Sequence, residues 1–448
     1  MVHRPAAAAR RADLVFLVAA LAFIGVAFAV GTVLNDRGVP LHAHAAPLLA
    51  HWRPRVGPTT PAASAIAVVV VGWGPAVADR LGWYRLLLAS YAISGSWVLA
   101  LGLVDGWSRL VEPLTENSTY LAEVDTAPPL LELLRTFSGR IVHGESPDPW
   151  ATHVAGHPPG ALEFFVLLDR LGLGGAGWAG TVCVLTGSSA CVAVAVALRS
   201  VAGERMARQA VPYLVLVPAA IWIGVSADAF FLAVSAWGVA LLAVATRTSG
   251  ARSDLAACGS GLLLGCTLYL SYGLVLIAAV AGAVLLAGRR VRPGIVALAV
   301  VAAVVVAVTT AGFWWWEGYQ QLAIRYYQGW GGERPYAYWV WADLAALLLC
   351  TGPAVAVGLR RIGGQCVTAV RSRVLPHGWG VGAVVLGAAV AILAATLSGF
   401  SKAEVARIWL PFALWLVAAC ALLPRPRRWL AVQAVTALLL QHLLLVNW

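Results

Sequence analysis

Long, uninterrupted apolar runs dominate this sequence of 448 residues, and they limit what it can fold into. Runs of about 20 residues recur along the chain, which is the length a helix needs to cross roughly 30 Å of hydrocarbon. The runs are continuous rather than alternating, so they predict helices and not the strands of a membrane barrel. Hydrophobic residues make up 60% of the chain and charged residues only 11%, a balance that excludes an ordinary soluble globule. The sequence therefore predicts an all-α, polytopic membrane protein.

The positive charge of the chain lies in short arginine patches between the apolar runs. The formal net charge is +11, but this pattern is typical of the basic residues that stay on the cytoplasmic side and orient membrane helices. It therefore argues against a nucleic-acid partner. Arg4, Arg10 and Arg11 precede the first run and place the N-terminus inside. The seven cysteines contain no C-x-x-C pair, so we interpret them as packing residues and not as disulfides or metal ligands.

Apolar length and the side of each arginine patch together predict about 13 membrane spans. Residues 161–173 are short and charged, and we expect them to be interfacial or re-entrant. Residues 1–79 are predicted to form an added helical hairpin ahead of the main membrane domain, residues 80–448. The predicted spans are 14–34, 62–78, 86–104, 178–198, 211–226, 229–245, two within 256–286, 295–311, 339–359, 381–397, 407–423 and 430–446.

A long polar loop, residues 105–160, stands out against this apolar background. By the predicted topology it lies outside the membrane, where we expect it to cover an active site at the outer surface. Leu130, Leu133, Leu134, Phe137 and Ile141 recur within it at helical spacing, which predicts an amphipathic helix on the membrane surface.

Acidic side chains of this loop are candidates for a general base. Glu116 is our first candidate, while Glu123 and Asp125 compete for the same role. The alternative for a single acid in an outer loop is an ordinary solvated side chain. Asp228, predicted on the same side of the membrane, is either a functional acid or the N-cap of a helix.

Basic residues late in the chain are candidates for phosphate binding. Lys402 is the only lysine of the protein, and Arg407 follows it closely. Lysine offers a compact point charge and arginine a bidentate fork, and both are predicted at the level of the lipid headgroups. The alternative is that both side chains are snorkelling anchors at a helix end.

The order of these residues resembles the motifs of GT-C-fold glycosyltransferases. The loop from Glu116 and Tyr120 to His157-Pro158-Pro159 is similar to the first extracytoplasmic loop of that family. The nearest resemblance is to the group of dolichyl-phosphate-mannose protein mannosyltransferases and aminoarabinose transferases. Three departures are visible: the loop follows the third span rather than the first, Asn117 stands where a second acid is usual, and Gly160 replaces a leucine.

Three later segments continue the resemblance. Ser226-Ala227-Asp228-Ala229 is similar to the acid motif of the second loop, and Leu270-Ser271-Tyr272 to a Lys/Ser-Tyr turn. The segment from Lys402 through Glu404 and Arg407 to Pro411 resembles the late motif that holds the donor phosphate.

The resemblance implies a multi-pass GT-C-like enzyme that moves a sugar from a polyprenyl-phosphate donor, with inversion of the anomeric carbon. Glu116 or Asp125 would take the acceptor proton, while Lys402 and Arg407 would stabilise the departing phosphate. Asp228 would orient the acceptor, or a divalent cation if one is used. The remaining residues expected at the substrate are Tyr120, His157, Tyr272 and Glu404.

The expected acceptor is a cell-envelope glycan, a lipid or a protein on the extracytoplasmic face of the cytoplasmic membrane. The arginine-only, Ala/Val-rich composition suggests a GC-rich bacterial genome. Two other functions stay open from the sequence: a transporter or lipid flippase, and a non-catalytic membrane scaffold with the same fold. Transporters tend to place ionisable groups near the middle of the membrane, whereas most of the predicted spans here lack charges at their centres.

Overall fold

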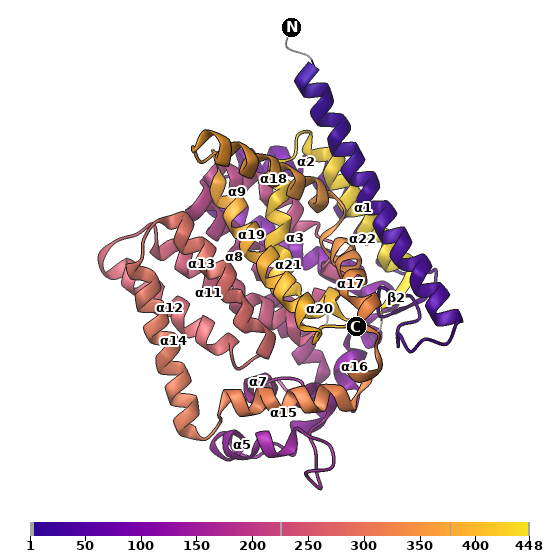
Figure 1. Cartoon of the computed structure of the whole chain (residues 1–448), viewed down its shortest axis with the longest axis vertical. Coiled ribbons are helices and arrows are strands. Elements are labelled where there is room, and N and C mark those ends of the chain that lie inside the picture. Colours follow the sequence, from indigo (N-terminus) through magenta and orange to yellow (C-terminus); the bar gives the residue numbers. More distant parts are fainter. Residues whose placement is uncertain (1–3, 225, 377, 447–448) are drawn as a thin grey trace.

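The structure, a computed structural model, describes residues 4–224, 226–376 and 378–446 as a bundle of helices (Figure 1). Seven helices of the described chain are long and apolar enough to cross a membrane, and each coincides with a predicted span. They are α1 (Arg4–Asp36), α2 (Thr60–Arg80), α3 (Trp83–Gly102), α8 (Gly175–Ala202), α11 (Ala227–Ala245), α14 (Arg292–Ala311) and α19 (Trp379–Ser398).

An eighth candidate is sharply bent. The predicted span 339–359 contains the end of α17 (Tyr336–Thr351) and the start of α18 (Ala354–Ser372), which meet at an angle of 104°. Gly352 has a φ of +86° and Pro353 follows it, a combination that ends one helix and permits another to begin in a new direction. The predicted span 339–359 is therefore broken at Gly352 and Pro353, and whether it crosses the membrane stays a prediction.

The total of about 13 spans is not confirmed, because several apolar segments form short helices. The predicted span 211–226 contains the end of α9 (Glu204–Val215) and all of α10 (Ala220–Ile223). The predicted span 407–423 contains α21 (Leu410–Val417) and the 3-10 helix η6 (Ala418–Leu422). Every residue of α10 and α21 is buried inside the protein. These segments are apolar because they fill the core of the bundle.

Four further helical elements and two short strands belong to the bundle. The predicted pair of spans within 256–286 appears as α12 (Gly250–Thr267), followed by η5 (Tyr272–Ile277) and α13 (Ala278–Gly288). The last helix is α22 (Pro426–Leu443). Strand β1 (Ala50–Trp52) pairs antiparallel with β2 (Leu444–Val446), a small exception to the all-α prediction that ties the segment after α1 to the C-terminal region.

The N-terminal segment is closely attached to the rest of the protein. The Tyr338 hydroxyl of α17 donates to the Ala27 carbonyl of α1 at 3.0 Å, and Arg55 Nε donates to Asp105 at 2.7 Å. The division of the chain between residues 79 and 80 stays a prediction.

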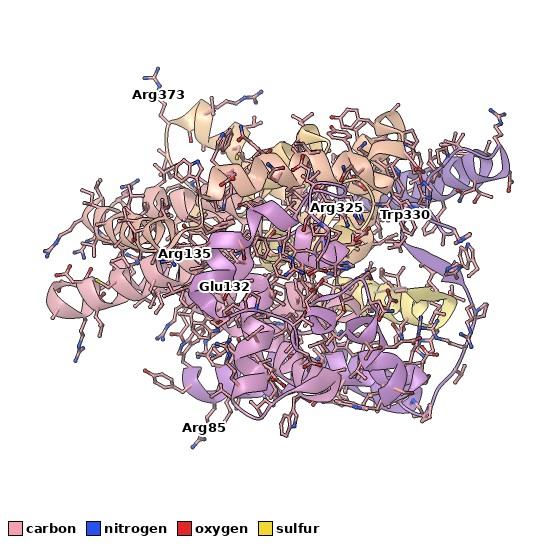
Figure 2. All side chains as sticks on the ribbon, turned by 90° about the horizontal axis from the view of Figure 1, so that it is seen from below. Arg85, Glu132, Arg135, Arg325, Trp330 and Arg373 are labelled. Carbon is pink, nitrogen blue, oxygen red and sulfur yellow. The ribbon has the colours of Figure 1, made fainter. Side chains whose placement is uncertain are left out.

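The polar loop gathers at the end of the molecule away from the N-terminus, where α5, α7 and α15 lie (Figure 1). The predicted surface helix within 130–141 is shorter than expected and consists of α5 (Leu130–Thr136) and the turn η4 (Ser138–Arg140). Figure 2 shows this end, with Glu132 and Arg135 of α5 labelled. The other elements here are α4 (Trp107–Val111), η1 (Leu103–Asp105), η2 (Glu112–Thr115), η3 (Tyr120–Glu123), α6 (Thr152–Ala155), α7 (Pro159–Arg170), α15 (Trp315–Gln328) and α16 (Trp330–Glu333).

Gly160 has a packing role that explains why leucine is absent there. A Cβ atom at this position of α7 would lie 2.6 Å from the Tyr269 carbonyl oxygen. We expect Gly160→Ala to reduce stability by about 1–3 kcal/mol, because α7 must move away from that backbone. Thermal unfolding of the detergent-purified protein measures the effect. Gly139→Ala is the matched control, since no atom lies within 4 Å of its Cβ position. Equal stability of the two variants would contradict this explanation.

Candidate functional site

A buried ion pair joins two segments that the sequence analysis selected separately. Arg407 Nη1 of α20 (Val405–Ile408) lies 2.8 Å from Asp228 Oδ2 in the first turn of α11, although the residues are 179 positions apart. Both side chains are 5% exposed. The second terminal nitrogen, Arg407 Nη2, donates to Glu404 Oε2 at 2.8 Å. The guanidinium fork thus binds two carboxylates, the geometry for which arginine is suited.

Arg334 extends this network of ion pairs, although it was not among the residues predicted from the sequence. Its Nη1 lies 3.3 Å from Glu404 Oε1 and 2.9 Å from the Lys402 carbonyl oxygen, and its side chain is 5% exposed. Arg334 stands between α16 and α17 in an aromatic segment, with no motif to mark it. We call Asp228, Arg334, Lys402, Glu404 and Arg407 the Arg407 cluster. Its three basic and two acidic side chains leave a net formal charge of +1.

Within this cluster, backbone carbonyl groups hold the Lys402 ammonium. Its Nζ donates to the carbonyl oxygens of Gly331 at 2.6 Å and Arg334 at 3.1 Å. The ammonium also lies 5.8 Å and 5.9 Å from the ring centroids of Tyr326 and Tyr327. Burial lowers the pKa of Lys402, and the Arg334 charge adds to this. In this arrangement Lys402 fixes the segment after α16 rather than reaching far into solvent.

The backbone turns sharply beside Lys402. Ala403 and Glu404 have φ values of 64° and 56°, in the left-handed region that residues other than glycine rarely adopt. The Ala403 amide donates to Asp343 Oδ1 at 3.2 Å, which holds the turn. Such backbone strain persists only where surrounding contacts enforce it, and it gathers at functional sites. Here the turn accompanies the contacts of Glu404 with both arginines.

Two histidines of the polar loop lie next to the cluster. His157 Nδ1 donates to the His153 carbonyl at 2.8 Å, and His153 Nδ1 donates to the Ser118 carbonyl at 2.8 Å. Burial lowers the pKa of His157, and it lowers that of His153 to about 4, an effect that the Arg407 charge strengthens. Both imidazoles are therefore neutral near pH 7. His157 was among the residues predicted from the sequence and His153 was not, although a His-x-x-x-His spacing marks the pair.

Tyr120 lies against the same histidine. Its ring stacks on Phe165 at 5.0 Å and meets His157 edge-on at 5.7 Å. Burial raises the pKa of Tyr120 well above its ordinary value, and the Asp228 carboxylate raises it further. The Tyr120 hydroxyl has no hydrogen-bond partner among the residues that the structure describes, so it is a buried donor close to the cluster.

The loop acids proposed as the base lie at the surface. Glu116 and Asp125 are exposed, and Glu116 Oε2 accepts a long 3.4 Å bond from Ser118. Glu123 has a structural role, because it accepts from the Ala151 amide at 2.8 Å and lies 3.7 Å from Arg140. The carboxylate buried beside Arg407 is Asp228, which is 3% exposed.

Tyr272 belongs to a separate aromatic group. Its ring packs edge-on against Trp315 at 5.3 Å and against Tyr319 at 6.1 Å, both in α15. Its hydroxyl is buried without a hydrogen-bond partner within the described chain. Tyr272 therefore supports the surface helix α15 directly, and its expected contact with substrate stays a prediction.

A narrow crevice lies beside Glu404 and Arg407. It has ≈ 290 Å³ of empty space, but it is constricted to about the size of one water molecule. Its other walls come from the segment before β1 and from the C-terminal strand, which the motifs did not include. The remaining lining residues are Pro47, Leu48, Leu49, Trp222, Val405, Ala406 and Val446.

A divalent cation finds no ready ligand set in the described chain. No group of three or more His, Cys, Asp or Glu side chains within the described ranges is arranged to hold a metal ion. Asp228 and Glu404 instead share the Arg407 guanidinium, and Arg334 supplies a second positive charge beside Glu404.

The low pKa of His153 predicts that stability depends on pH. The unfolded chain takes up a proton on this side chain near pH 6.5, whereas the folded protein resists it until about pH 4. The free energy of unfolding therefore keeps its full value above pH 6.5 and falls by about 2–3 kcal/mol as the pH decreases to 4. Thermal midpoints of wild type and His153→Gln between pH 8 and pH 4 test this. The variant should show a shallower decrease than wild type, and equal slopes for the two proteins would contradict the prediction.

Comparisons with known proteins found a distant structural likeness. No protein-family model matches this chain, and no curated protein matches it. A solved structure that it resembles is the Archaeoglobus fulgidus oligosaccharyltransferase in complex with Zn and sulfate. The identity is 14% and the TM-score 0.49, over 75% of this chain and 48% of the other. This chain thus spans about half the length of that protein, and a likeness of this degree says nothing about its activity.

Proposed function

We propose that this protein is a membrane glycosyltransferase that moves a sugar from a polyprenyl-phosphate donor to an acceptor on the extracytoplasmic side. The observation that supports it best is the buried Asp228–Arg407 ion pair. It joins an acid and the segment that we expect to bind phosphate, which come from distant parts of the chain, next to the polar loop. This combination at the end of a membrane bundle suits chemistry on a lipid-linked substrate.

The charge of the cluster suits an anionic donor. Three cations outnumber two carboxylates, so the cluster retains a positive charge for a phosphate. Burial by itself raises the pKa of Glu404, but the Arg407 and Arg334 charges outweigh it and lower the pKa to about 2. Glu404 therefore stays ionised and holds both arginines in position. Positive groups fixed in advance around a departing phosphate are the largest contribution expected in such a site.

Asp228 replaces the exposed loop acids as our candidate for the base. In the proposed step the acceptor hydroxyl oxygen bonds to the anomeric carbon while the carbon–oxygen bond to the phosphate breaks. The bonding electrons leave with the phosphate, and the acceptor proton passes to the Asp228 carboxylate. Because the acceptor approaches opposite the leaving phosphate, the anomeric configuration inverts.

The crevice must widen before a sugar can bind. Residues Pro47, Leu48 and Leu49 cover Glu404 and Arg407 from one side. We propose that movement of this segment, together with Val446 next to it, opens the site to the donor.

A non-catalytic scaffold is the second candidate. The observation in its favour is that the acids of the cluster are already paired within the chain, as they are in structural ion networks. The two functions differ in whether the protein changes the glycans of the cell.

Mass analysis of cell-envelope glycans after deletion of the gene tests the proposal. A glycosyltransferase predicts loss of one sugar unit and accumulation of its lipid-linked donor. Wild type and Glu116→Gln should restore the unit, while Asp228→Asn should not. Unchanged glycans in the deletion strain would refute the enzyme and favour the scaffold.

A further inference from the structure

A second pocket lies on α18, away from the Arg407 cluster. It has ≈ 680 Å³ of empty space and is more open than the crevice described above. Figure 1 shows α18 near the end of the molecule where the N-terminus lies, opposite α15 and α16. The lining residues are Arg360, Arg361, Gly364, Gln365, Thr368, Pro376 and Leu422.

The two arginines of this pocket share a single carboxylate. Arg360 Nη2 donates to Asp13 Oδ1 at 2.5 Å and Arg361 Nη2 donates to Asp13 Oδ2 at 2.6 Å. Asp13 is 2% exposed, so α1 supplies one buried negative charge for two guanidinium groups. The Nε–H groups of both arginines lack a hydrogen-bond partner among the described residues. The two guanidinium groups and the one carboxylate thus leave an excess positive charge at the pocket.

Polar side chains of the next turns complete the lining. The Thr368 hydroxyl donates to the Gly364 carbonyl at 2.9 Å, which leaves its oxygen free to accept a hydrogen bond. The Gln365 amide can both donate and accept. A ligand that combines a phosphate with hydroxyl groups would match these side chains.

Exposed apolar residues also lie along α18. Val367, Val370 and Val374 are 50%, 80% and 66% exposed, and they follow the arginines along α18 and its end. Because α18 is bent by 104° from the membrane-type helix α17, it runs across the bundle end rather than along the bundle. An arginine-rich amphipathic helix of this kind lies at the headgroup level, and the side with most arginine is the cytoplasmic one.

We propose that this pocket binds the headgroup of an anionic membrane lipid on the predicted cytoplasmic face. Arg360 and Arg361 bind the phosphate diester, Gln365 and Thr368 bind headgroup hydroxyls, and the acyl chains lie against the exposed valines. The inference does not depend on the proposed glycosyltransferase activity, because no residue of the Arg407 cluster takes part.

Lipid binding to the detergent-purified full chain tests this site. Phosphatidylglycerol and phosphatidylcholine with identical acyl chains are titrated in native mass spectrometry, with inorganic phosphate as a third arm. We expect phosphatidylglycerol to bind about tenfold more tightly than phosphatidylcholine, a difference of about 1.4 kcal/mol. Equal binding of both lipids would overturn the proposal, and so would inorganic phosphate that displaces the lipid at equal concentration.

Three variants test whether the preference for phosphatidylglycerol arises in this pocket. Asp13→Asn/Arg360→Gln/Arg361→Gln removes both cations without leaving a buried acid unpaired, and should abolish the preference. Gln365→Leu/Thr368→Val keeps the ion pairs, and hence the fold, and should weaken phosphatidylglycerol binding about threefold to tenfold. Arg371→Gln/Arg373→Gln removes exposed charges from the same region outside the pocket; Figure 2 shows Arg373 projecting from the molecule. If this control loses the preference as fully as the triple variant, diffuse surface charge explains the binding and the pocket does not.

Discussion

Arg407→Gln is expected to destabilise the protein by about 3–5 kcal/mol, because it leaves the buried Asp228 carboxylate without its counter-charge. Asp228 and Glu404 each lie 2.8 Å from this guanidinium. Arg334 remains beside Glu404, whereas Asp228 loses the arginine that its carboxylate contacts at 2.8 Å. The thermal midpoint of the detergent-purified protein measures the loss.

A double variant separates loss of the ion pair from general damage. Asp228→Asn/Arg407→Gln removes both charges, so it should be more stable than Arg407→Gln alone. Arg407→Lys should lie between wild type and Arg407→Gln, since a lysine cannot bind two carboxylates as a guanidinium does. Arg85→Gln is the control, because Arg85 is exposed at the surface (Figure 2). An Arg407→Gln protein as stable as this control would show that the buried pair contributes nothing to the fold.

Asp228→Asn is expected to reduce sugar transfer by about 10²–10⁴-fold while the protein stays folded. Asparagine can still accept the hydrogen bond from Arg407 Nη1, but it cannot take a proton from the acceptor. Transfer is measured with purified variants, lipid-linked sugars extracted from wild-type membranes, and membrane extracts of the deletion strain as acceptor.

The exposed loop acids provide the matched comparison for this variant. Glu116→Gln and Asp125→Asn should keep transfer within about threefold of wild type, as expected for solvated surface carboxylates. If Glu116→Gln abolishes transfer and Asp228→Asn does not, the loop acid is the base and our assignment is wrong. Thermal midpoints of all three variants show whether a lost activity reflects a lost fold.

Sequence motifs could not have predicted which residues line the crevice. Leu48 and Val446 line it from opposite ends of the chain, and both lie in or next to the segments that pair as β1 and β2. Neither residue carries a chemical signature, because an apolar side chain at an active site looks like any other. Their position depends on strand pairing between segments almost 400 residues apart. Next to this pairing, Arg55 Nη1 donates a hydrogen bond to the Leu444 carbonyl, 389 positions away.

The long helices follow directly from the amino-acid composition, because hydrocarbon leaves an apolar backbone few other ways to pair its polar groups. Asp228, Glu404 and Arg407 could also be selected from the sequence, since charged residues are conspicuous in apolar surroundings. Which apolar segments face outward and which, like α21, fill the core depends on how the helices pack, because lipid and protein interior favour the same side chains. The position of Asp228 rather than Glu116 beside Arg407 also depends on packing, which brings together residues 179 positions apart.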